Sequence, residues 1–182
     1  MTAMLLVGLG NPGSQYADTR HNVGFMAVQA ILHRHFAGLN WQEKFKGLYA
    51  SGTMHGQKIH FLLPQTYMNL SGESVRPALD FFKLDIDDIC VIHDELDLEL
   101  GDIRIKKGGG HAGHNGLKSM IQHLGTPDFR RVRFGIGHPG RKDLVSPYVL
   151  GNFRAEETPA VEDGCTLITK AFPNWLDGEW KV

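Results

Sequence analysis

Short apolar runs alternate along the chain with segments in which apolar residues recur every three or four positions. The first pattern is typical of buried strands, and the second of helices with one face in a core. We expect strands over residues 4–9, 48–54, 58–63, 89–92, 102–106 and 131–137. We expect helices over residues 19–36, 71–82 and 115–124 and over about the last 25 residues, with Thr19 and either Asn69 or Ser71 as N-caps.

This interleaving of strands and helices predicts a single α/β domain over residues 1–182, with a twisted mixed β-sheet covered by α-helices. The length of 182 residues suits one domain, and no repeat, low-complexity segment or linker divides the chain. Apolar residues make up 42% of the sequence and charged residues 21%, which excludes extended disorder and a collagen-like or coiled-coil rod.

The location of the protein is predicted from what the sequence does not contain. No apolar run approaches the ~20 residues that a membrane span needs, and no basic start followed by an apolar region indicates a secretory signal. The two cysteines, Cys90 and Cys165, are far apart, and we expect them to be buried thiols rather than a disulfide framework. These features predict a cytoplasmic protein.

Charge is distributed unevenly along the sequence. Of 19 basic and 20 acidic residues, nine basic residues and one acid fall between positions 104 and 142, so that segment is near +8 and the remainder near −9. One explanation is a basic face for a polyanion such as RNA, and the other is a set of solvated residues on several faces. Composition leaves both open.

The segment Gly8-Leu9-Gly10-Asn11-Pro12-Gly13 follows the first predicted strand and matches the spacing of a dinucleotide-binding loop. The match is weak, because Pro12 interrupts it and no Asp or Glu lies between Asp18 and Glu43, where the ribose-binding acid would be expected. The alternative is a structural turn. Asn11 would then present a polar amide at the carboxyl end of a strand, where ligands of α/β sheets bind.

Two segments could together form a general base. His21 lies at the predicted start of the first helix, where the helix dipole favours the neutral imidazole. Asp94 follows a buried strand and could accept a hydrogen bond from that imidazole, the arrangement that general-base hydrolysis needs. Taken separately, a histidine there could serve packing alone, and an acidic strand end could bind a cation or have no function.

Two further segments combine ligand-binding side chains with helix starts. Residues 64–72 hold Tyr67 and Asn69, which could stack on and hydrogen-bond to an unpaired RNA end. Residues 108–116 begin with three consecutive glycines ahead of a helix. Glycines allow a ligand to approach the backbone closely, and a helix N-terminus favours an anion. A metal site of His111, His114 and Asp94 is a weaker alternative, because no metal-ligand spacing motif supports it. The chain also lacks the Gly-x-Ser-x-Gly motif of serine esterases.

In order and spacing these segments closely resemble the bacterial peptidyl-tRNA hydrolase family. The matching segments are residues 8–13, Tyr16, Thr19-Arg20-His21-Asn22, residues 67–72, His93-Asp94-Glu95-Leu96-Asp97, residues 108–116 and Gly135-Ile136-Gly137-His138-Pro139. The resemblance implies a monomeric cytoplasmic α/β enzyme that needs no metal and no coenzyme. Such enzymes cleave the ester between a peptide and the 3′-terminal ribose of tRNA, and so recycle tRNA from abandoned translation.

The resemblance also implies roles for individual residues. His21 matches the family's catalytic base, Asp94 the carboxylate that stabilises it, and Asn11 the residue that distinguishes peptidyl-tRNA from tRNA with an unblocked amino acid. The expected contacts with substrate and with tRNA phosphates are Tyr16, Tyr67, Met68, Asn69, Asn115, Arg104, Lys106 and Arg133. Tyr67 replaces a common Phe, and the chain ends at Val182 after an acidic stretch, without the longer basic tail of many relatives.

The leading functional hypothesis is therefore hydrolysis of the peptidyl-tRNA ester by a water molecule that His21 activates. The alternative is a non-catalytic RNA-binding module on the same fold. Pure RNA binding does not require Asn11, His21 and Asp94 together, and their joint presence favours the enzyme. A nucleotide-dependent enzyme is a third reading of the fold, disfavoured by the missing acid.

Overall fold

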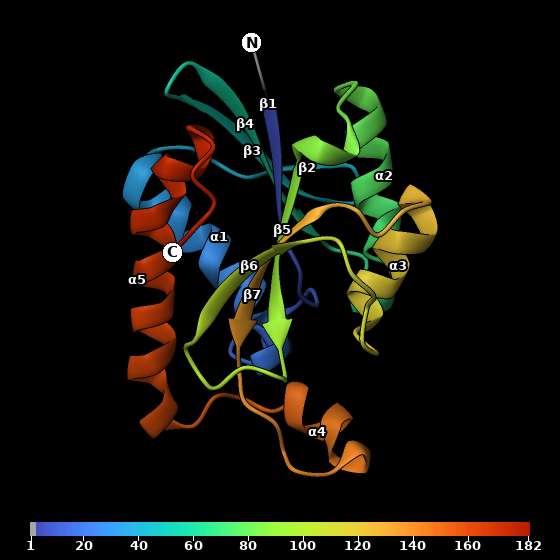
Figure 1. Cartoon of the computed structure of the whole chain (residues 1–182), viewed down its shortest axis with the longest axis vertical. Helices are drawn as coiled ribbons and strands as arrows, with labels where there is room; N and C mark the ends of the chain where they lie inside the picture. Colours follow the sequence, from blue (N-terminus) through green and yellow to red (C-terminus); the bar gives the residue numbers. More distant parts are fainter. Residues whose placement is uncertain (1–2) are drawn as a thin grey trace.

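The computed structural model describes residues 3–182 as one seven-stranded mixed sheet between two layers of helices (Figure 1). The strand order is β2-β3-β4-β1-β5-β7-β6. The strands are β1 (Ala3–Gly8), β2 (Gln42–Lys44), β3 (Gly47–Met54), β4 (Gln57–Pro64), β5 (Ile89–Glu95), β6 (Ile103–Lys107) and β7 (Arg130–Gly135). The α-helices are α1 (Val23–His35), α2 (Gly72–Phe81), α3 (Asn115–Leu124), α4 (Val145–Val149) and α5 (Thr158–Leu176).

The sheet is parallel at its centre and antiparallel at its margins. β1 pairs in parallel with both β4 and β5, and β5 pairs in parallel with β7, whereas β3 and β6 run antiparallel to their neighbours. The strands that follow β1 in sequence are first added on one side of it, from β2 to β4, and then on the other side, from β5 to β7. The strand order therefore switches at β1, which lies between β4 and β5. Ligands of α/β sheets bind at the carboxyl ends of strands beside such a switch point.

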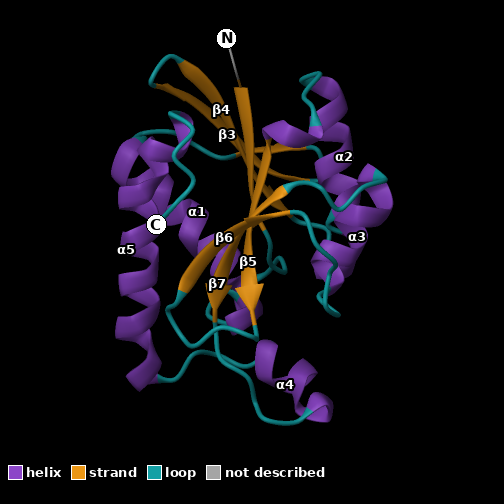
Figure 2. Ribbon diagram, in the orientation of Figure 1, coloured by secondary structure: helices purple, strands orange, loops and turns teal. Residues whose placement is uncertain are grey.

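Each face of the sheet carries its own core, because buried central strands are apolar on both sides. Helices α1 and α5 cover one face, where Leu6 and Ile92 meet Val28 and Phe172. Helices α2 and α3 cover the other face, as Figure 2 shows on the opposite side of the strands. Within residues 3–182, no helix combines the length and the apolar character that crossing a membrane requires.

The six predicted strands and four predicted longer helices are confirmed, with ends shifted by a few residues. Two elements escaped prediction: β2 is three residues long and polar, and α4 is five residues long and contains a proline. Cys90 is buried as expected, but Cys165 is only partly buried.

The predicted N-caps are confirmed in position but not in function: Thr19 precedes the 3₁₀ turn of residues 20–22 and Ser71 precedes α2, but neither side chain makes a capping hydrogen bond. The hydroxyls of Thr19 and Ser71 donate backward, to the carbonyls of Tyr16 and Met68, and cap no helix. Asn69 lies inside a 3₁₀ turn. Each of the two helices is instead preceded by a 3₁₀ turn, residues 20–22 before α1 and residues 68–70 before α2. His21 consequently lies in a tight turn just before the helix.

The glycines of residues 8–13 serve close packing and a turn. A Cβ atom on Gly8 would lie 2.5 Å from the carbonyl oxygen of Gly24 in α1, and one on Gly10 would lie 2.8 Å from the Phe25 ring. Gly13 has a φ of 103°, which side chains disfavour. No helix begins inside the motif, since α1 starts only at Val23. This geometry favours the structural turn, and it brings Asn11 close to the start of α1.

Candidate active site

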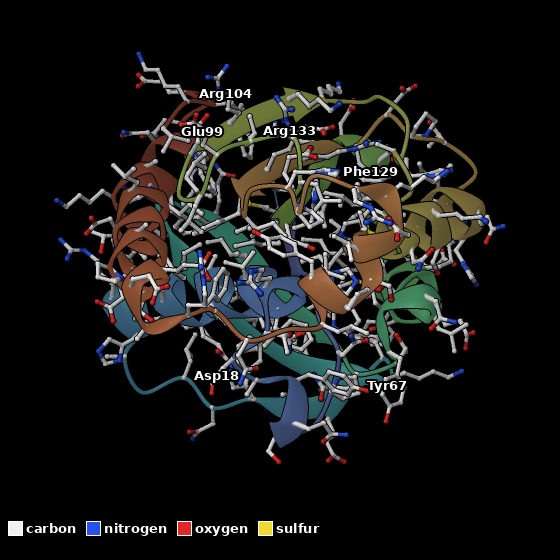
Figure 3. All side chains as sticks on the ribbon, turned by 90° about the horizontal axis from the view of Figure 1, so that it is seen from below. Asp18, Tyr67, Glu99, Arg104, Phe129 and Arg133 are labelled. Carbon is white, nitrogen blue, oxygen red and sulfur yellow. The ribbon has the colours of Figure 1, made fainter. Side chains whose placement is uncertain are left out.

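A cleft of about 810 Å³ opens at the carboxyl ends of β1 and β5. Its walls come from the turn before α2, the segment leading into α3, and α4. The cleft brings together ten of the eleven residues that the sequence singles out: Asn11, Tyr16, His21, Tyr67, Met68, Asn69, Asp94, Lys106, Asn115 and Arg133. In Figure 3, which looks onto this end of the molecule, Tyr67 and Arg133 lie at opposite margins of it.

The carboxylate of Asp94 is the centre of the site. It is 4% exposed, and its Oδ2 atom lies 2.7 Å from Nδ1 of His21, within the reach expected for a base and its orienting group. Since the carboxylate can only accept, Nδ1 of His21 carries the proton and donates it. Nε2 is then the unprotonated nitrogen of the neutral ring, and no residue of 3–182 bonds to it.

A second histidine, His114, donates to the other carboxylate oxygen. Its Nε2 atom lies 2.7 Å from Oδ1 of Asp94. Its Nδ1 atom accepts hydrogen bonds from the backbone N–H groups of Gly116 and Leu117, and thereby caps the N-terminus of α3. Because Nδ1 accepts twice, the proton must be on Nε2, and His114 is a neutral donor in a fixed tautomer. Two imidazole N–H groups therefore satisfy one buried carboxylate.

This pairing determines the charge states at the site. Burial opposes ionisation of Asp94, but His21 and His114 hold the pKa of its carboxyl well below its usual range. Burial alone would lower the pKa of His21, whereas the negative charge of Asp94 and the hydrogen bond to it raise that pKa above 6.5 overall. Burial lowers the pKa of the neighbouring His93 to about 3, so that ring stays neutral. The result is an anion beside one imidazole that can gain a proton at moderate pH.

Asn22 aligns Asn11 with His21. Its side-chain amide exchanges two hydrogen bonds with the backbone of Asn11, accepting from the N–H and donating to the carbonyl, both at 2.9 Å. The side-chain oxygen of Asn11 accepts from the backbone N–H of Met68 at 2.7 Å. This bond fixes the amide orientation, so the NH₂ group of Asn11 is left as a donor that no residue within 3–182 occupies. The site therefore presents a fixed donor beside the base.

Tyr67 forms one edge of the cleft in a strained backbone conformation. Its φ is 63°, which is uncommon for a residue with a side chain, and the residue is 52% exposed. The Tyr16 ring meets it edge to face, with centroids 6.3 Å apart. Asn69 and Asn115 are exposed amides on the same cleft. Strain persists where surrounding contacts hold it, and here the next residue, Met68, is held by Asn11.

Arg131 is not part of a solvated basic face, although it belongs to the basic segment of residues 104–142. It is fully buried, and its guanidinium donates to the carbonyls of Gly109, Gly110 and Pro127 at 2.6–2.8 Å. It thus clamps the glycine loop that leads to His114. A strand pattern cannot distinguish a solvated arginine from one that satisfies carbonyls of a loop folded over it.

The predicted basic face is smaller than the sequence suggests. Arg104 and Arg133 are cross-strand partners, as are Lys106 and Arg131, so these four side chains share one face of the β6–β7 pair. Lys106 and Arg133 line the cleft; Arg104 lies outside it, paired with Asp102. Lys107, which also belongs to the basic segment of residues 104–142, does not join this patch, because side chains alternate along a strand and Lys107 pairs with Asp87 at 2.8 Å.

The structure does not bring together the metal site considered from the sequence, which consisted of His111, His114 and Asp94. His111 does not approach Asp94; its Nδ1 accepts from the N–H of Gly113. His21, Asp94 and His114 do place potential ligand atoms within 4.8 Å of one another. In each pair, however, the nitrogen and oxygen lie 2.7 Å apart with the proton located as described, which is a hydrogen bond. These residues fit a proton-handling network better than a metal-ligand set.

Comparison with known proteins agrees with this arrangement. The sequence profile of the peptidyl-tRNA hydrolase family matches residues 5–181. The peptidyl-tRNA hydrolase of Oceanobacillus iheyensis is 49% identical over 96% of this chain and 93% of its own length. That of Beijerinckia indica is 52% identical over 97% of this chain and 88% of its own length.

A solved structure extends the comparison to the fold. The crystal structure of peptidyl-tRNA hydrolase from Acinetobacter baumannii superposes with a TM-score of 0.89. It is 41% identical in sequence, and the match covers 97% of this chain and 91% of that one. The residues of the site, the fold and the sequence identity agree with one another: the chain belongs to the peptidyl-tRNA hydrolase family.

Proposed function

We propose that this protein hydrolyses the ester that joins a peptide to the 3′-terminal ribose of tRNA, with His21 as general base. The observation that carries the proposal is the hydrogen bond between Nδ1 of His21 and the buried carboxylate of Asp94, which leaves Nε2 as the base. We expect a monomer to be the active species, as the resemblance to the family implies. We place the activity in the cytoplasm, where translation consumes tRNA.

The reaction needs no covalent link to the protein. Nε2 of His21 takes a proton from a water molecule as the water oxygen attacks the ester carbonyl carbon. The charge of Asp94 stabilises the imidazolium that forms. The tetrahedral intermediate then collapses, the bond to the ribose oxygen breaks, and that oxygen receives the proton held on Nε2 of His21, which returns the ring to its neutral form. The NH₂ groups of Asn11, Asn69 and Asn115 supply donors for the peptide and the developing oxyanion.

The preference for blocked substrates follows from the fixed orientation of Asn11. Its NH₂ group can donate to a peptide carbonyl, but it offers nothing to the ammonium of a free aminoacyl group, which is also a donor. An ammonium placed there would lose hydration without gaining an acceptor. Asn11 thus contributes to specificity through the bond that Met68 makes with it. The non-catalytic alternative gives no reason for this arrangement.

The activity is tested with an N-acetylated aminoacyl-tRNA in the presence of a chelator. We expect release of free tRNA and of the N-acetyl amino acid. His21→Ala should lower kcat by about 10²-fold or more while tRNA binding stays close to that of the parent, because the imidazole acts on water. His138→Ala is the matched control, since His138 lines the same cleft but does not contact Asp94. Equal rates for the parent and His21→Ala would overturn the assignment.

Asn11→Asp should relax or invert the preference for blocked substrates. The aspartate would keep one oxygen on the Met68 N–H and present the other, as an anion, to an incoming ammonium. The measurement is the ratio of kcat/KM for acetylated and free aminoacyl-tRNA. Ser146→Asp adds the same charge at an exposed position of the cleft that the mechanism does not use, and it should change this ratio much less. An unchanged ratio in Asn11→Asp would contradict the proposed role.

Lys106 and Lys107 form a matched pair for testing phosphate recognition, because they are neighbours on opposite faces of β6. If Lys106, Arg133 and Arg104 contact the tRNA backbone, Lys106→Ala should flatten the slope of log K against log salt by up to ~1. Lys107→Ala should leave the slope unchanged. The KM for a minimal ester without the tRNA body should change in neither variant. Equal slopes for both variants would show that the patch does not contact phosphate.

A further inference from the structure

Helix α4 forms a wall of the cleft, but its own backbone hydrogen bonds do little to stabilise it. Val145, Ser146, Val149 and Leu150 line the cleft from this helix and the residue after it. With only five residues, α4 is too short to be stable alone. In Figure 1 it lies apart from both helix layers, below the ends of β5 and β7. Its position must therefore be fixed by contacts with other elements.

Those contacts converge on the turn that carries the base. Apart from the adjoining 3₁₀ turn, α4 packs chiefly against residues 20–22. The Arg20 guanidinium lies 4.2 Å above the Tyr148 ring and donates to the Tyr148 carbonyl at 3.2 Å. The backbone N–H of Arg20 donates to the carbonyl of Gly151 at 3.0 Å. On its far side, the Tyr148 hydroxyl donates to Ile136.

Arg20 also reaches the segment before α5. Its Nη2 atom donates to Oε1 of Glu157 at 2.8 Å, and the side chains of the pair are only 8% and 7% exposed. The same carboxylate oxygen accepts from the backbone N–H of Arg154. One guanidinium therefore joins three segments, the turn of His21, helix α4 and the start of α5, and it does so away from water.

The geometry assigns to Arg20 the role of a positioning residue that seats the α4 wall against the turn of His21. This inference rests on the proposed function. Arg20 is adjacent to the base in sequence but does not line the cleft, and so it cannot contact the ester. It acts through α4, whose distance from His21 sets the room available to the peptidyl end. Substrate binding should depend on Arg20 more than the proton transfer does.

Arginine is required because its planar fork makes several directed bonds at once. A lysine has one compact ammonium, which can reach the Glu157 carboxylate but cannot also lie flat on the Tyr148 ring and bond to its carbonyl. Arg20→Lys therefore keeps the buried charge pair and removes the connection to α4. Arg154→Lys is the matched control, because Arg154 also lies near Glu157 but is 66% exposed and is not bonded to α4.

The test combines kinetics with hydrogen exchange of the full chain. For Arg20→Lys we expect a KM for N-acetyl-aminoacyl-tRNA about tenfold higher, a change in kcat of less than about threefold, and an unchanged midpoint of the pH–rate profile. Amides of residues 145–152 should exchange about tenfold faster, while those of β5 should be unaffected. Arg154→Lys should match the parent in all of these.

The inference is overturned if exchange in residues 145–152 is unchanged in Arg20→Lys, or if kcat and the pH midpoint change while KM does not. The second result would mean that Arg20 acts on the base itself. Should Arg20→Lys fail to fold, Glu157→Gln weakens the same junction while keeping an acceptor for Arg20, and the same readouts apply. Because exchange is measured without substrate, a protein that lacked the proposed activity would still test the seating of α4.

Discussion

A buried carboxylate that needs two donors determines how this site is built. Asp94 is almost inaccessible to water, and an ion in such a place must be paired or lose its charge. Two imidazole N–H groups meet this need, one from the turn before α1 and one from the N-terminus of α3. The Asp94 side chain on β5 therefore joins two segments that come from opposite faces of the sheet, the turn of His21 and the start of α3.

The pairing also makes the two histidines different from each other. His114 uses its remaining nitrogen, Nδ1, to cap α3. A proton on Nδ1 would break the cap, because it would face the backbone N–H groups of Gly116 and Leu117. His21 keeps its remaining nitrogen for the cleft. The same carboxylate thus holds one ring as a fixed structural donor and the other as a base. An asparagine at position 94 could accept from only one of them, since its NH₂ group would meet the N–H of the other.

Much of this arrangement could be predicted from the sequence. Apolar periodicity predicted the sheet and the longer helices, and the motif around residues 19–22 and 93–97 predicted the pairing of His21 with Asp94. These signals are local or depend on where strands end in an α/β sheet. The same reasoning placed most of the polar side chains in one cleft.

The remaining features depend on contacts between distant segments. His114 as second donor, Arg131 under the glycine loop and Arg20 between α4 and α5 all rely on partners that are backbone carbonyls or lie far away in sequence. No residue pattern identifies such partners. Counting cations overestimated the basic face for the same reason, because Lys107 and Arg131 have the expected charge but point to Asp87 and into the protein.

The central claim is that Asp94 fixes the tautomer of His21 and raises its pKa. ¹⁵N NMR of the ring nitrogens, followed through a pH titration of the parent and of Asp94→Asn, tests it directly. In the neutral rings, observed at pH values above the titration midpoint of His21, Nδ1 should be protonated and Nε2 bare in His21, and the reverse should hold in His114. The titration midpoint of His21 should lie above 6.5 in the parent and move below that value in Asp94→Asn, where burial is no longer opposed. A neutral His21 ring with its proton on Nε2, or the same midpoint in both proteins, would contradict this account.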